Sequence, residues 1–260
     1  MLYFCARVYL KSSPHKLNGV MILFYILRKK TVLMGVVFAA AVAGIAVCGI
    51  LHQRHERAQT VFSVPVSGKV VVVDAGHGGF DGGAKDNGIV EKEVNLDVAL
   101  RLKEYIEQGG GVAVLTRSED VSTASPGTAG KSAKRSDLEE RKKLAESSNA
   151  DIFVSIHMNK FPQTQYKGAQ VFYGSEPEDG KKLGEEIQES LREILKDSNQ
   201  RSAKKTDGSI FLLKNTTIPS VIVECGFLSN PQEAQLLRQD AYRRKLAWAI
   251  YLGITKYFNQ

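Results

Sequence analysis

Two histidines stand at the ends of strand-like runs in this sequence. The stretch VVVDAGHGGFDGG, residues 71–83, leads from valines into His77 among glycines, and the run IFVSIHMN ends a second apolar segment at His157. Either histidine alone is explained as a core residue bonded to backbone carbonyls. In open α/β sheets, however, ligands bind beyond the carboxyl ends of the strands, so the two side chains can meet in one crevice although they are far apart in the chain.

Two glutamates complete a candidate metal site. Glu224 ends the run SVIVE, and a lone carboxylate there costs several kcal/mol to bury unless it is paired, protonated or exposed to a wet cleft. Glu91 follows the glycine-rich loop at the start of a predicted helix, where the helix dipole favours a carboxylate. A structural salt bridge for Glu224 and simple capping for Glu91 are the alternatives. Together, two imidazoles and one carboxylate form the ligand set of a catalytic zinc site, with the second glutamate left as a general base.

The elements that must position these residues alternate between strand-like and helical patterns. We predict strands over 69–74, 112–116, 152–156, 169–173, 210–213 and 221–223, and helices over 91–108, 137–147, 178–196 and 233–257. This alternation predicts an α/β fold with a single, mixed but mostly parallel sheet and helices on both faces. The irregular stretch 118–136 is expected to be a loop that contacts substrate or a partner.

An uncharged run at 31–51, TVLMGVVFAAAVAGIAVCGIL, is long enough to cross a bilayer core of about 30 Å. The basic triplet RKK precedes it, so the positive-inside tendency places residues 1–30 in the cytoplasm and exports the chain from residue 52 onward. We predict a transmembrane signal anchor and a membrane-tethered, extracytoplasmic domain. A cleaved signal peptide, which would release the domain, is the alternative, and Met21 is an alternative start.

The basic surplus of the chain belongs to this N-terminal segment. The formal charge is +7, and the first 60 residues hold eight Lys and Arg against one Glu, which leaves equal numbers of basic and acidic residues in the rest. A neutral domain gives no reason to expect nucleic acid as a partner. Only Cys225 of the three cysteines lies after the apolar run, which excludes a disulfide framework. We predict a linker over 52–67 and one catalytic domain over 68–260.

Four motifs occur in a familiar order: DAGHGG, EKEVNLDVALRL, LEERKKLAESSNADIFVSIHMN and IVECGFLSN. From about Val66 to Phe258 the chain resembles the zinc-dependent N-acetylmuramoyl-L-alanine amidases of the Amidase_3 family. The resemblance implies one Zn²⁺ held by His77, Glu91 and His157, with Glu224 as the catalytic residue. It also implies support for the ligands, or substrate contacts, from three further residues, which are Asn95, Ser155 and Asn159. Two departures from the usual pattern are Ala75, where the family has proline, and Cys225 inside the last motif.

Within the family, the chain is similar to the CwlD-type amidases of endospore-forming bacteria. That similarity implies hydrolysis of the amide between N-acetylmuramic acid and L-alanine, on glycan strands with stem peptides in spore cortex peptidoglycan. It places the domain in the forespore or spore envelope, where its action precedes formation of muramic δ-lactam after a separate deacetylation.

Two other functions fit the same residues. A non-catalytic peptidoglycan-binding protein would either have lost the metal or have a structural zinc closed by four protein ligands, with Cys225 as the fourth. A zinc carboxypeptidase would cut the stem peptide instead. The sequence leaves open the oligomeric state, the preferred glycan length and whether an activating or recruiting protein partner is required.

Overall fold

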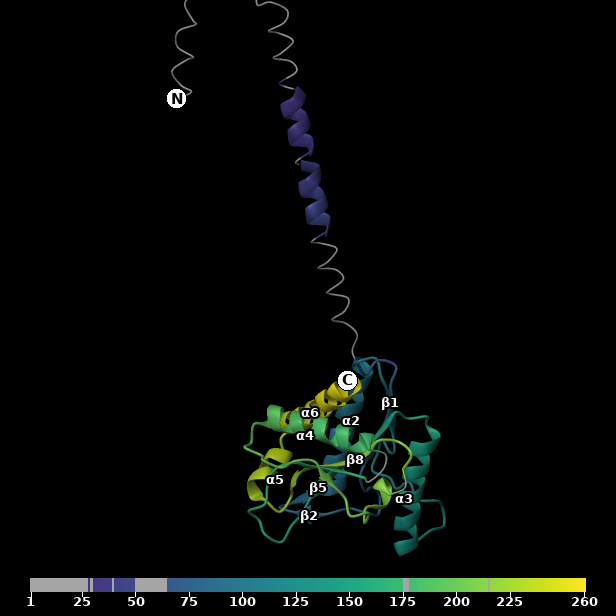
Figure 1. Ribbon diagram of the computed structural model, residues 1–260. Helices are drawn as coiled ribbons and strands as arrows, with labels where there is room; N and C mark the ends of the chain where they lie inside the picture. Colours follow the sequence, from purple (N-terminus) through teal and green to yellow (C-terminus); the bar gives the residue numbers. More distant parts are fainter. Residues whose placement is uncertain (1–27, 29, 39, 50–64, 175–177, 215) are drawn as a thin grey trace, which may run out of the picture. The chain divides into compact units, whose positions relative to one another are not determined.

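The structure is a computed structural model that describes residues 28, 30–38, 40–49, 65–174, 178–214 and 216–260. It divides the chain into two compact units, Met1–Phe62 and Ser63–Gln260. The predicted catalytic domain falls within the second unit (Figure 1). Much of the predicted cytoplasmic segment and nearly all of the predicted linker, residues 1–27 and 50–64, lie outside the described residues.

One six-stranded sheet forms the centre of the second unit, with the strand order β4-β1-β5-β8-β6-β7. In chain order the strands are β1 Val70–Ala75, β4 Val112–Leu115, β5 Ile152–Asn159, β6 Gln170–Tyr173, β7 Lys204–Lys205 and β8 Ser220–Phe227. β1 pairs in parallel with both β4 and β5, and β5 pairs in parallel with β8, whereas β6 is antiparallel to β8. The predicted mixed, mostly parallel sheet is therefore confirmed.

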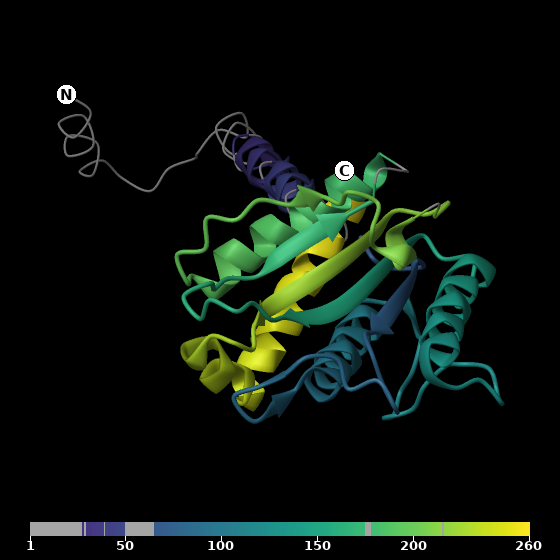
Figure 2. The same ribbon diagram turned by 90° about the horizontal axis from the view of Figure 1, so that it is seen from below.

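Helices cover both faces of the sheet, as predicted. Figures 1 and 2 show three of them side by side along one face, namely α2 Glu91–Gln108, α4 Asp179–Leu195 and α6 Asp240–Phe258. The other face is covered by α3 Gly130–Ser147 and the short 3₁₀ helix η1 Phe211–Leu213. Alternation along β1 produces the two cores, because Val71 and Val73 belong to the large one and Val72 packs with Ala145 of α3.

The same alternation decides where the candidate site lies. In β5, Val154 and Ile156 belong to the core under α2, α4 and α6, so Ser155 and His157 lie on the face that α3 covers. Glu224 of β8 pairs with His157 across the parallel ladder and lies on the same face. The strand ends therefore bring the predicted histidine and glutamate together, near the carboxyl edge of the sheet.

Three predicted elements differ from the observed ones. Helix α3 begins at Gly130 rather than at 137, and the predicted loop is correspondingly shorter. The sequence pattern does not indicate the first two turns of this helix, because they carry charged and small residues with no apolar stripe. The predicted strand over 210–213 is η1, a short apolar run whose period does not separate strand from helix. The predicted helix over 233–257 is two helices, α5 Pro231–Leu237 and α6.

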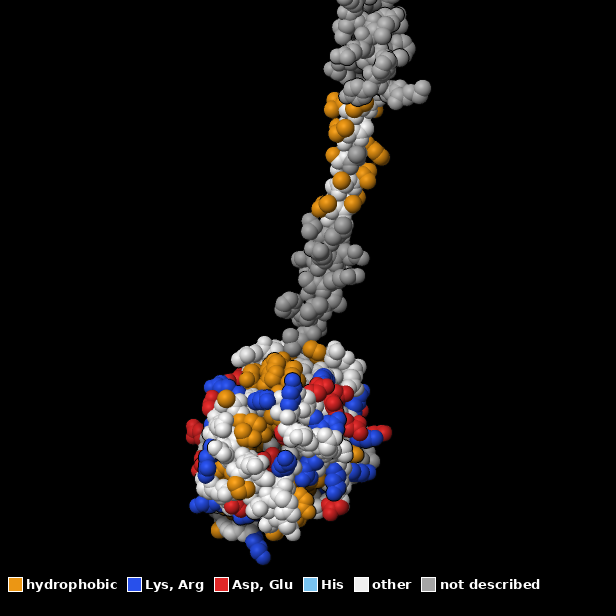
Figure 3. All heavy atoms as spheres, turned by 90° about the vertical axis from the view of Figure 1, so that its left-hand side faces the viewer, with side chains coloured by type: hydrophobic (Ala, Val, Ile, Leu, Met, Phe, Trp, Pro, Cys, Tyr) orange, Lys and Arg blue, Asp and Glu red, His pale blue; other side chains and the backbone are white. Residues whose placement is uncertain are grey.

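The first unit contains a helix over Lys30–Gly49. By length and composition it could cross a membrane, and Figure 3 shows hydrophobic side chains along it. A signal sequence near the N-terminus would meet the same criterion. The helix itself agrees with the predicted apolar segment, whereas its role as an anchor stays a prediction.

Candidate active site

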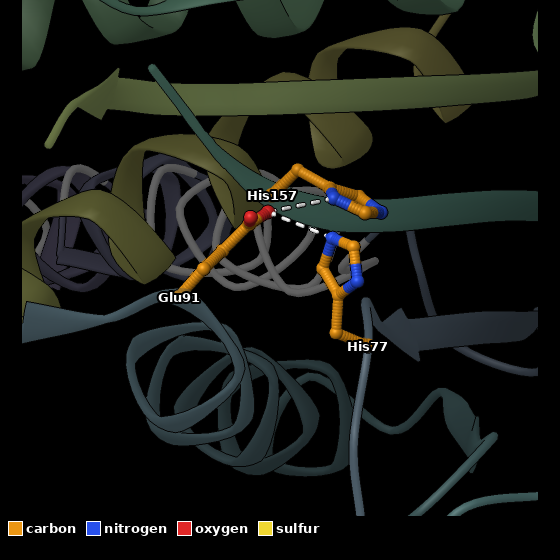
Figure 4. A group of neighbouring side chains, drawn as sticks. All are labelled: His77, Glu91 and His157. Carbon is orange, nitrogen blue, oxygen red and sulfur yellow. Dashed lines mark hydrogen bonds and ion pairs between the residues drawn. The ribbon is translucent and has the colours of Figure 1, made fainter. Parts of the chain in front are cut away.

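Three ligand-type side chains converge from three elements (Figure 4). His77 follows β1, Glu91 is the first residue of α2, and His157 lies in β5. Glu91 Oε1 is 3.3 Å from His77 Nε2 and 2.9 Å from His157 Nδ1. In a tetrahedral zinc site with metal–ligand distances of 2.0–2.1 Å, neighbouring ligand atoms are about 3.3 Å apart. The spacing of Glu91 from each histidine suits two ligands of one small cation, and the three candidate ligand atoms all lie within 4.8 Å of one another.

A short hairpin sets the path between the first two of these residues. Strands β2 Lys85–Asp86 and β3 Ile89–Val90 pair around Asn87 and Gly88, which both have positive φ, as a tight two-residue turn requires. The chain then enters α2 directly at Glu91, whose carboxylate accepts the backbone N–H of Ala84 at 2.7 Å. This hydrogen bond ties the glycine-rich loop to the side chain of Glu91, the candidate ligand that follows it.

Two glycines allow the ligands to approach the backbone. A Cβ at Gly76 would lie 2.3 Å from His157 Nε2, and a Cβ at Gly83 would lie 2.5 Å from Glu91 Oε2 and 2.7 Å from His77 Cδ2. No side chain fits at either position without moving a ligand. This close approach explains why the first histidine stands among glycines.

We therefore expect Gly76→Ala to displace the His157 ring and lower kcat/KM about 10²-fold, the scale of a misplacement of about 1 Å in an active site. The backbone of Gly76 is not in the left-handed region, so the conflict is steric alone. Gly82→Ala is the matched control, because a Cβ there meets only Val90 Cγ1, at 3.6 Å. Metal affinity and kcat/KM of purified variants test this, and equal values for the two variants would contradict it.

Glu224 provides a second carboxylate beside the cluster, outside the group of three candidate ligands. Its Oε2 is buried and, among the described residues, has no hydrogen-bond partner. Burial raises the pKa of Glu224 to about 7, a shift that nearby Glu91 reinforces and the two histidines oppose. Cys225 points to the opposite face and is fully buried in the large core. It therefore does not provide the fourth ligand that a closed structural zinc would need.

Hydrogen bonds fix the orientation of the His77 ring. Asp81 Oδ2 is 2.9 Å from His77 Nδ1 and 3.1 Å from Lys134 Nζ, a lysine of α3. Burial lowers the pKa of His77, but Glu91 and Asp81 outweigh it and raise that pKa above its ordinary value. A carboxylate on the outer nitrogen of a histidine fixes the tautomer and turns the other nitrogen toward the ligand position.

Glu91 is held as firmly. Burial raises the pKa of this carboxyl, but hydrogen bonds and charge from both histidines outweigh burial and hold it well below its usual range. Asn95 Nδ2 lies 3.4 Å from Glu91 Oε1 and 3.0 Å from the Gly76 carbonyl. Among the residues predicted to support the ligands, Asn95 thus contacts a ligand directly.

Ser155 and Asn159 take different places. Ser155 is fully buried and donates its hydroxyl to Asp74 Oδ2, behind the cluster. Asn159 lies two residues beyond His157 in β5, opposite Phe227. Ser155 therefore belongs to the buried network under the site, and the functional roles of both residues stay predictions.

Sequence reasoning missed an arginine clamp beneath the His77 loop. Arg117 donates to the carbonyls of Ala75 and Gly76 at 2.8 and 3.1 Å, and Arg141 of α3 donates to those of Ala75 and His77 at 2.8 and 2.7 Å. His77 has φ of 62°, a left-handed conformation that costs a non-glycine residue about 1–2 kcal/mol. The clamp therefore holds three successive carbonyls of a strained turn.

Buried charge keeps Arg141 in place. Its guanidinium is 1% exposed and lies 2.6 Å from both Asp74 Oδ1 and Asp137 Oδ2. Burial raises the pKa of Asp74, but Arg141 and the hydroxyls of Ser155 and Thr116 outweigh it and lower that pKa. The signal in the sequence is Asp74 itself, because a buried carboxylate directly after four valines requires a partner such as a buried cation.

Comparison with known proteins decides the family. Residues 71–256 match the Amidase_3 family, N-acetylmuramoyl-L-alanine amidase. The chain belongs to the Amidase_3 family. The predicted membership is thus confirmed over almost the whole of the second unit, and the cluster lies inside the matched range.

Relatives of this amidase agree in sequence and in structure. The germination-specific N-acetylmuramoyl-L-alanine amidase of Bacillus subtilis (strain 168) is 42% identical over 200 residues, which are 76% of this chain and 84% of that protein. The CwlD amidase from Clostridioides difficile, solved in complex with the GerS lipoprotein, is 44% identical with a TM-score of 0.71, covering 74% of this chain and 98% of that one. The catalytic domain of the amidase CwlV from Bacillus (Paenibacillus) polymyxa var. colistinus is 30% identical with a TM-score of 0.62, covering 74% and 98%.

These similarities establish the class of reaction. This chain is an enzyme of the N-acetylmuramoyl-L-alanine amidase class, and its substrate is peptidoglycan. Both predictions from the sequence are thereby confirmed. The family match and the relatives, which are amidases, favour neither a non-catalytic binding protein nor a carboxypeptidase.

Proposed function

We propose that this chain is a zinc-dependent amidase of spore cortex peptidoglycan, with one Zn²⁺ on His77, Glu91 and His157 and with Glu224 as general base and acid. The observation that carries the proposal is the convergence of three ligand-type side chains beside a buried, unpartnered carboxylate oxygen. Similarity to a germination-specific amidase supports the cortex as substrate. Cleavage there would free the lactyl group of muramic acid for δ-lactam formation after a separate deacetylation.

The residues of the chain divide the work of hydrolysis. When bound, Zn²⁺ lowers the pKa of a coordinated water to about 7 and polarises a carbonyl. Glu224 accepts the proton of the attacking water and returns it to the departing amine of L-alanine. Burial raises the pKa of Glu224, which favours return of the proton, and the charge of the metal opposes this rise and keeps the carboxylate available as a base. Asp81 and Asn95 keep His77 and Glu91 oriented throughout.

Location and partner are supported by two further observations. The helix Lys30–Gly49 supports tethering of the enzyme to a membrane, with the catalytic domain outside the cytoplasm. The CwlD structure contains a lipoprotein, GerS, and its similarity to this chain supports a membrane-attached protein partner here as well. We expect such a partner to activate or recruit the enzyme at the forespore envelope.

Removal of the metal tests the zinc proposal. Full-length protein in detergent, stripped with a chelator and dialysed, should release no new L-alanine amino termini from cortex peptidoglycan. One equivalent of Zn²⁺ should restore the release, whereas Mg²⁺ should not, because its preference for oxygen ligands does not suit two imidazoles. A sample dialysed without chelator controls for losses during handling. Full activity of protein shown to be free of metal would refute the proposal.

A further inference from the structure

An exposed aromatic pair lies just beyond the candidate site. Phe161 and Tyr166, in the segment after β5, are 44% and 42% exposed, and their rings meet edge to face with centroids 4.9 Å apart. Tyr166 also stacks on Phe227 of β8, with centroids 6.3 Å apart. Large aromatic rings left this exposed need an explanation, and three rings in contact form a fixed platform rather than isolated surface residues.

A bulge places this platform on the same face as the catalytic residues. His157 pairs with Glu224, but two residues later Asn159 pairs with Phe227, so β8 contains one extra residue. Paired residues point to the same side of a sheet, and the bulge thereby turns Phe227 to the face that carries His157 and Glu224. Along a strand, two residues span about 7 Å. The platform therefore begins within reach of a sugar next to the muramic acid whose amide bond is cleaved.

One planar polar group, a guanidinium, borders the rings. The guanidinium of Arg201 lies 5.0 Å from the centre of the Phe227 ring, and its Nη1 is 3.1 Å from Oε1 of Gln170. Gln170 in turn pairs with Glu224 across β6 and β8. Gln170 is buried, and its Nε2 donates to the Ser202 carbonyl, so its amide holds the Arg201 guanidinium in place beside the strand pair that carries Glu224.

We propose that Phe161 and Tyr166, with Arg201 beside them, form a subsite for the glycan strand of peptidoglycan. The inference rests on the proposed function of the neighbouring site. A β-linked N-acetylhexosamine has C–H groups on its ring faces, which match the negative faces of aromatic rings, and hydroxyl and acetamido groups at its rim, which match the N–H groups of a guanidinium. The platform selects polymeric glycan over a single muramoyl peptide.

Two substrates and a matched control test the subsite. With full-length, zinc-loaded protein, Phe161→Ala and Tyr166→Ala should lower kcat/KM on polymeric peptidoglycan roughly ten- to a hundredfold, the scale of one lost stacked ring, chiefly through KM. Hydrolysis of N-acetylmuramoyl-L-alanyl peptide without neighbouring sugars should not change. Tyr166→Phe should keep most of the wild-type rate. Trp248→Ala removes an aromatic ring that is 39% exposed on α6, on the opposite layer, and should alter neither substrate.

Equal losses on both substrates would mean that the rings only support the fold, and no loss on either would mean that they do not contact the substrate; either result overturns the subsite. Titration with a chitin hexamer, which has no scissile amide, separates this question from catalysis. Wild type should bind it and Tyr166→Ala should bind it at least tenfold more weakly, even if wild type proves to hydrolyse neither substrate. Equal binding by both proteins would refute the glycan subsite and leave the amidase proposal intact.

Discussion

Replacement of Glu224 by Gln is expected to lower kcat for release of L-alanine termini by about 10²- to 10⁴-fold, the usual contribution of a general acid–base. Glutamine has nearly the same shape, but it does not accept the proton of the attacking water or return one to the amine. The buried Oε2 of Glu224 has no described hydrogen-bond partner, so the substitution breaks no hydrogen bond of that atom. The loss should therefore appear in the chemical step, with metal content and melting temperature close to those of wild type.

The pH profile provides a second readout of the same residue. In the proposed mechanism the ionised form of Glu224 is the base, and burial raises its pKa to about 7, so the wild-type rate should decrease as the pH is lowered through that region. The charge of bound Zn²⁺ moves this limb to lower pH. In the Glu224→Gln variant the rate should no longer show the decrease at acidic pH that results from protonation of Glu224. Glu93→Gln, at an exposed position in the first turn of α2, controls for loss of one negative charge. A variant that keeps wild-type kcat would exclude Glu224 as the base.

The sequence predicts that the candidate site residues lie close together, because most of them follow predicted parallel strands. His77, His157 and Glu224 each follow a β-branched run, and parallel strands bring their carboxyl ends to one edge. Glu91 was predictable from its place after a glycine-rich loop, where it begins α2. The local pattern and the sheet topology are therefore sufficient to predict which residues form the cluster.

The surroundings of the cluster could not be predicted in the same way. Arg141 lies on a helix with almost no apolar stripe, and nothing in its own segment indicates that it is buried against Asp74. The bulge that turns Phe227 toward the site appears only in the pairing of two strands. Sequence patterns describe one element at a time, whereas charge pairing and register belong to pairs of elements.

The buried clamp makes Arg141 the residue whose loss should most affect stability. We expect Arg141→Met to lower the free energy of unfolding by about 3–5 kcal/mol, because it leaves a buried carboxylate without its cation. Asp74 would keep its hydrogen bonds from Thr116 and Ser155 but would lose its ion pair. In wild type the pKa of Asp74 is lowered, so its stabilising effect is present at neutral pH and is lost as the pH falls through that pKa. The stability gap between variant and wild type should therefore narrow on acidification, which chemical unfolding at several pH values would measure.

The same substitution should weaken zinc binding about 10- to 100-fold, because Arg141 holds the His77 carbonyl and with it a left-handed turn that would otherwise relax. Arg135→Met, on the exposed side of the same helix, is the matched control, and its surface ion pair with Glu139 contributes at most about 1 kcal/mol. Arg141→Lys separates the two roles of the clamp. It keeps the buried charge but lacks the planar fork that reaches two carbonyls and two carboxylates at once. We expect it to recover part of the stability and little of the zinc affinity; full recovery of both would mean that charge alone holds the ligand loop.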